Sequence, residues 1–144
     1  KRQFLNEEGV SLGAMGRGFH VFPLEHWGAP AYPELVLVAT HRKVDGDPET
    51  IRHVVRAFIA GTTAAVANPT ATTALLAKEL PGSERKLLAA RTAAALKALL
   101  PPDGVAGSLD PTLMARWAQW EVDHGIVSAK PDVAKLMTTR FSGR

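Results

Sequence analysis

Two adjacent acids, Glu7 and Glu8, follow the amide side chain of Asn6 in a segment that also contains Phe4, Leu5 and Val10. A carboxylate beside an amide can bind a polar ligand, and a carboxylate accepts hydrogen bonds from an exocyclic amine with the added strength of its charge. The alternative is structural, because acids in the first turn of a helix are stabilised by the helix dipole. The residue types alone leave both interpretations open.

Two aromatic residues, Trp27 and Tyr32, lie in an irregular connector rich in proline and glycine. Binding residues concentrate on loops at the ends of strands, and this connector precedes a predicted strand. Packing explains the two rings equally well. The candidate ligand-binding residues are therefore Asn6, Glu8, Trp27 and Tyr32, and no catalytic residue is predicted.

Other chemistries find little support in the sequence. The five histidines show no i, i+4 pair, so no metal site is predicted. The chain has no cysteine, which excludes disulfides and thiolate chemistry. The glycines of segment 13–18 are in the wrong order for a dinucleotide fingerprint, and no cofactor is predicted. The net charge of +3 comes from scattered basic residues, which favours a solvated surface over nucleic-acid binding.

The expected elements are two strands followed by helices. Residues 19–22 alternate and are bulky, and residues Glu34 to Thr40 form an unbroken apolar run that predicts a strand buried on both faces. The run is too short to span a membrane. Before the first strand, residues Phe4 to Leu12 favour a short helix.

Three helix starts share one signal, Asp or Asn followed by proline, in which the first side chain caps the helix and the proline needs no donor. A further helix is expected to be capped by Ser83 and to run to about Leu100, and a short one to follow Pro131. The three Asp/Asn-Pro pairs are Asp47-Pro48, Asn68-Pro69 and Asp110-Pro111.

Two motifs resemble the thiamine-pyrimidine-precursor family of type II solute-binding proteins. The first is Phe4-Leu5-Asn6-Glu7-Glu8-Gly9-Val10, in which Leu5 and Glu7 stand where the family has Trp and Tyr. The second is Gly28-Ala29-Pro30-Ala31-Tyr32-Pro33-Glu34-Leu35-Val36-Leu37-Val38. The Asp47-Pro48-Glu49 helix start and Gly125-Ile126-Val127 are also similar to the family pattern.

The resemblance implies an α/β fold, namely the C-terminal part of a two-lobed, periplasmic-binding-protein-like clamp with few strands and four to five helices. Residues 1–24 would be a remnant of the second lobe, residues 25–34 the crossover, and residues 35–144 the C-terminal part of the first lobe with a helical tail. The implied partners are a small solute, the permease of an ABC importer and a missing N-terminal half. The implied location is periplasmic, or extracellular and membrane-anchored.

The expected ligand is a thiamine pyrimidine precursor or a related amine-bearing molecule, because Glu8 would repel an anion. Two other functions stay open. Relatives of the same fold synthesise the thiamine pyrimidine, and the basic, helical C-terminal part also suits an interaction or nucleic-acid module.

The chain by itself is predicted to bind no small solute tightly, because the cleft of a two-lobed clamp needs both walls. Calorimetry against thiamine precursors should show no measurable heat of binding, and binding should return when the N-terminal half is supplied. Submicromolar binding by the chain alone would contradict the half-protein interpretation.

Overall fold

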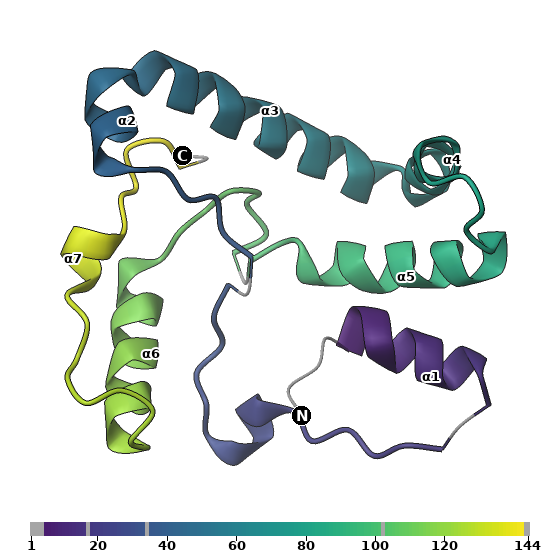
Figure 1. Ribbon diagram of the computed structural model, residues 1–144, viewed down its shortest axis with the longest axis horizontal. Coiled ribbons are helices and arrows are strands. Elements are labelled where there is room, and N and C mark those ends of the chain that lie inside the picture. Colours follow the sequence, from purple (N-terminus) through teal and green to yellow (C-terminus); the bar gives the residue numbers. More distant parts are fainter. Residues whose placement is uncertain (1–4, 17, 34, 102, 143–144) are drawn as a thin grey trace. The chain divides into compact units, whose positions relative to one another are not determined.

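The computed structural model describes the chain except for residues 1–4, 17, 34, 102 and 143–144, and the described part is helical throughout (Figure 1). A short π-helical segment, η1 (Leu5–Gly9), leads directly into α1 (Val10–Ala14), and a 3-10 turn, η2 (Leu24–Trp27), follows. The remaining helices are α2 (His41–Gly46), α3 (Pro48–Ala67), α4 (Pro69–Glu79), α5 (Arg85–Ala98), α6 (Pro111–Asp123) and α7 (Val133–Leu136). None of the described helices is long and apolar enough to cross a membrane.

The expectation of an α/β fold is wrong, because the described residues form no strand. Residues 19–22 and 35–40 are irregular, and Glu34 lies outside the described residues. The apolar side chains of the second segment are exposed, Leu35 by 81% and Val38 by 88%. Thr40, the expected strand end, instead caps α2 by accepting a hydrogen bond from the Lys43 amide at 3.2 Å. A strand requires a neighbour that offers matching N–H and C=O groups, and no described segment pairs with this one.

All three Asp/Asn-Pro pairs open helices as the sequence predicts. The side-chain oxygens of Asp47, Asn68 and Asp110 accept hydrogen bonds from backbone amides two or three residues ahead, at 3.2, 3.0 and 2.8 Å. The prediction for Ser83 is wrong, because α5 begins at Arg85 after Glu84, which makes no side-chain cap. Local capping therefore determines most helix starts in this chain.

The chain divides into two compact units. Unit 1 comprises residues Lys1–His20 and Ala57–Ala106, and unit 2 comprises Val21–Arg56 and Gly107–Arg144. In unit 1, helix α5 contacts α4 on one side and α1 with η1 on another (Figure 1). Its buried residues are Leu88, Thr92 and Leu96, so α5 supplies most of the small core of this unit.

Unit 2 is organised around α6, which contacts α7. Trp117 is buried and lies in a continuous stack of rings: its centroid is 4.0 Å from that of Tyr32 and 5.0 Å from that of Trp120, which in turn stacks on His124 at 4.2 Å. Aromatic pairs at such separations add stability beyond the area they bury. Trp117 is therefore a packing residue of unit 2.

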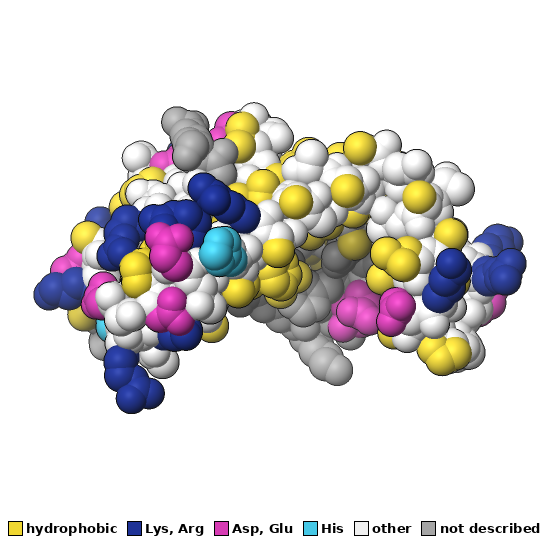
Figure 2. Space-filling view, turned by 90° about the horizontal axis from the view of Figure 1, so that it is seen from above, with side chains coloured by type: hydrophobic (Ala, Val, Ile, Leu, Met, Phe, Trp, Pro, Cys, Tyr) yellow, Lys and Arg dark blue, Asp and Glu magenta, His cyan; other side chains and the backbone are white. Residues whose placement is uncertain are grey.

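Much apolar surface stays open to solvent in both units, as the apolar side chains coloured yellow in Figure 2 show for one face. The described residues of α3 and α4 include none that is buried. Phe58 is 58% exposed and Leu75 is 60% exposed. Helical propensity and caps, more than core burial, therefore account for these two helices.

The junction of α2 and α3 predicts a specific acid dependence. The Lys43 ammonium donates a hydrogen bond of 2.6 Å to Asp47, and this contact, followed by the hydrogen bonds from Thr50, lowers the pKa of Asp47 from 3.8 to about 2. Because the folded-state pKa lies below the unfolded-state value, Asp47 stabilises the fold fully above pH 3.8 and loses that contribution as the pH falls towards 2. Asp47→Asn, which keeps the cap, should flatten the dependence of Tm on pH in that window.

An NMR titration of the Asp47 carboxyl checks this directly, with an expected midpoint of about 2. Lys43→Met should raise the midpoint towards the ordinary value. A midpoint near 3.8 in the unmodified protein would show that the Lys43 contact is absent in solution.

Candidate functional site

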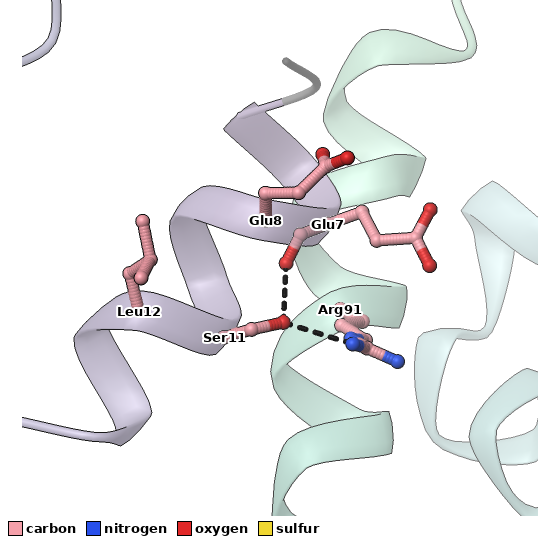
Figure 3. A pocket seen from close by; sticks show the side chains of 5 residues that line it. All are labelled: Glu7, Glu8, Ser11, Leu12 and Arg91. Atoms are coloured by element: carbon pink, nitrogen blue, oxygen red, sulfur yellow. Dashed lines mark hydrogen bonds between the residues drawn. The ribbon is translucent and has the colours of Figure 1, made fainter. Parts of the chain in front are cut away.

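A pocket of about 270 Å³ lies in unit 1 between the N-terminal helical segments and α5. Its lining combines acidic, basic, hydroxyl and apolar side chains, namely Glu7, Glu8, Ser11, Leu12 and Arg91. In the view of Figure 3 the side chains of Glu7, Ser11 and Arg91 extend to the right, whereas Glu8 rises towards the upper right and Leu12 points upwards. The lining thus combines a few polar groups with an apolar side chain, as small-molecule sites commonly do.

The run of helix from η1 into α1 positions the N-terminal half of this lining. Glu7 and Ser11 are four residues apart, and so are Glu8 and Leu12, so each pair lies on successive turns of one face. Arg91 comes from the middle of α5, which contacts both η1 and α1. Packing of α5 against these segments therefore completes the site.

Ser11 connects the two parts of the pocket through its hydroxyl group. The Ser11 Oγ donates a hydrogen bond to the main-chain oxygen of Glu7 at 2.6 Å and accepts one from Arg91 Nη2 at 2.8 Å (Figure 3). A serine hydroxyl has one proton and two lone pairs, so both bonds can form together. This network fixes one end of the Arg91 guanidinium at the pocket.

One further donor of Arg91 lacks a partner. Its Nε is buried and has no hydrogen-bond partner among the described residues. A buried donor without a partner costs about 1–3 kcal/mol, so such groups are uncommon, although the hydroxyl of the neighbouring core residue Thr92 is another. Arg91 is therefore held at a cost, which is consistent with a role beyond packing.

The formal charge of the lining is one negative unit, from two carboxylates and one guanidinium. Glu8 is half-buried and Glu7 is exposed. The carboxylates accept hydrogen bonds and the guanidinium donates them, so the pocket suits a ligand that carries both a donor and an acceptor. It disfavours an anion, which would meet two like charges.

A second depression in unit 1 lies along α3 and offers different chemistry. It has a volume of about 390 Å³, and Thr62 supplies its only side-chain polar group, the other lining residues being Ala57, Phe58, Gly61, Ala65 and Leu99. Among the described residues, no group of three His, Cys, Asp or Glu side chains could hold a metal ion. The polar pocket at α5 is therefore the better candidate site.

The residues predicted from sequence fall in different units. Glu8 lines the pocket, and Asn6 lies in η1, but its side chain is outside the described part of the chain. Trp27 ends η2 in unit 2 and is 71% exposed, and Tyr32 stacks on Trp117 in the same unit. The ligand-binding roles of Asn6, Glu8, Trp27 and Tyr32 stay predictions. Sequence reasoning missed Ser11 and Arg91, because nothing local connects positions that are 80 residues apart.

Residues 3–72 match the model of the family described as NMT1/THI5 like. This segment, just under half of the chain, is similar to that family. The predicted family resemblance is thereby confirmed, and it indicates a function in thiamine-precursor-related binding or biosynthesis. The matched span includes Glu7, Glu8, Ser11 and Leu12 and ends before Arg91. No curated protein and no solved structure matches the chain.

The Ser11 hydroxyl is expected to hold α1 against α5. Ser11→Ala removes the acceptor of Arg91 and should accelerate amide hydrogen exchange in Val10–Ala14 about fivefold, since a net hydrogen bond contributes about 1 kcal/mol. Ser83→Ala, in the exposed loop between α4 and α5, is the control and should leave these rates unchanged. Equal rates in both variants would show that the Arg91 contact does not persist in solution.

Proposed function

We propose that this chain contributes the ligand-contacting carboxylates of a solute-binding component of an ABC importer, with a thiamine pyrimidine precursor or a related amine-bearing molecule as the solute. The observation that carries the proposal is the position of Glu8. It lies within the segment matched to the NMT1/THI5-like family and lines the polar pocket of unit 1. The family relationship and the local chemistry thus favour the same residue.

The chemistry of the pocket favours an amine as the recognised group. Glu7 and Glu8 can accept hydrogen bonds from an exocyclic amine, and bonds to a charged acceptor are stronger than neutral ones. A sulfonate or nitrate would be repelled by the net negative lining. Among small solutes, the site therefore favours aminopyrimidines over oxyanions.

The hydrogen bonding of Ser11, the one hydroxyl group in the pocket lining, favours binding over biosynthesis. The family includes both binding proteins and synthases. Ser11 donates its proton to a main-chain carbonyl oxygen, whereas an activated nucleophile would donate to a base such as histidine. The lining contains no histidine. What these side chains offer a ligand is hydrogen bonding and charge.

The importer role also requires a second wall. The pocket is smaller than the ~300–1,000 Å³ of typical ligand sites, and one of its carboxylates is exposed. A second lobe that closes over the pocket would exclude water and strengthen the contacts to Glu7 and Glu8. The proposal therefore includes the partners that the family resemblance implies, an N-terminal half and a permease, and an extracytoplasmic location.

Glu8→Gln is the decisive test. In the two-lobed protein it should weaken the binding of an aminopyrimidine roughly ten- to a hundredfold, because a charge-assisted hydrogen bond contributes about 1.5–3 kcal/mol. Isothermal titration with a panel of aminopyrimidines, simple amines and sulfonates measures the change. Glu79→Gln, at the exposed end of α4, is the matched control and should bind as the unmodified protein does. Unchanged affinities in Glu8→Gln would reduce Glu8 to a helix-start acid and remove the main support for this ligand class.

A further inference from the structure

Arg91 is the one basic residue among the side chains that line the pocket, and it lies outside the segment matched to the family. Its Nη2 is fixed by Ser11 at 2.8 Å. Its Nε is buried without a described partner, so the guanidinium is not saturated by the protein groups around it. A planar guanidinium that is anchored at one nitrogen and lines a pocket is pre-organised to meet an acceptor there.

The neighbouring charges restrict what that acceptor can be. Glu7 and Glu8 share the pocket with Arg91, so a charged acceptor such as phosphate would be attracted by one group and repelled by two. A neutral acceptor, such as a ring nitrogen or a carbonyl oxygen, has no such conflict. An amine that binds the carboxylates and a neutral acceptor that binds Arg91 can belong to one small ring.

We propose that Arg91 is a specificity-determining residue that selects ligands carrying a neutral hydrogen-bond acceptor beside the amine, as the ring nitrogen of an aminopyrimidine does. This inference rests on the proposed function and deepens it, because it names the two ligand groups that the pocket recognises, an amine and a neutral acceptor beside it. Ser11 is then a positioning residue, since it orients the guanidinium and donates its one proton to the main chain of Glu7.

Two probes distinguish recognition of the amine by the carboxylates from recognition of the neutral acceptor by Arg91. 4-Aminopyrimidine carries the amine and ring acceptors, whereas aniline carries the amine on a ring without an acceptor. Arg91→Met should weaken 4-aminopyrimidine about tenfold and aniline less than twofold, because only the first probe loses a hydrogen bond to a charged donor. NMR titration of the two-lobed protein measures both affinities in the range expected for such small ligands.

Matched variants distinguish recognition from a structural effect. Arg85→Met makes the same change at the exposed start of α5 and should alter neither affinity. Ser11→Ala, like Arg91→Met, should reduce the ratio of the affinity for 4-aminopyrimidine to that for aniline. Arg91→Lys should keep part of the preference for 4-aminopyrimidine that Arg91→Met loses. A structural role alone would weaken both probes equally and leave their ratio unchanged.

Two results would overturn the assignment. If Arg91→Met leaves the ratio unchanged while Glu8→Gln still weakens both probes, Arg91 does not read the acceptor, and the proposed function stands without it. If the unmodified two-lobed protein binds neither probe, the proposed function and the role of Arg91 fall together.

Discussion

The hydrogen bond from Arg91 to Ser11 is the contact on which the polar pocket depends. It joins the N-terminal helical segments to α5 across 80 residues of sequence, and Ser11 carries the connection on to the main chain of Glu7. Arg91 is partly buried, and a charge removed from water without such partners is costly. The same contact therefore binds two distant segments together and sets the charge pattern that a ligand would meet.

The two units are stabilised in different ways. Unit 1 has a small core along α5, where Leu88 and Leu96 are buried, and a polar connection at its edge. Unit 2 relies on rings, because Trp117 is held between Tyr32 and Trp120 in one continuous stack. Tyr32, which the sequence predicts to contact the ligand, contributes to that packing. Its stacking on Trp117 does not test the predicted role in binding. Trp27 is the more exposed of the two candidate aromatic residues.

Helices α3 and α4 show how far local preferences alone can determine structure. No charged side chain occurs between Ala57 and Ala77, and the described residues of both helices are at most partly buried. Alanine has the highest helical propensity, and the Asp47 and Asn68 caps satisfy free amides at the two helix starts. These interactions involve neighbours along the chain, so the helices form without a large core around them.

The sequence by itself determined three helix starts and the family resemblance of residues 3–72. Asp47-Pro48, Asn68-Pro69 and Asp110-Pro111 each act within one turn, so a short window of residues contains the whole interaction. The motif around Glu8 is likewise contiguous, and the family match over residues 3–72 includes it.

Only the tertiary structure decided that residues 35–40 form no strand and which residues line the pocket. An unbroken apolar run favours a buried strand, but a strand exists only where another segment supplies its hydrogen bonds, and the described part of the chain supplies none. Arg91 could not be assigned to the site from sequence for the same reason. Its partner Ser11 is distant in the chain, and pairing over such a distance is decided by how α5 packs, which no local pattern encodes.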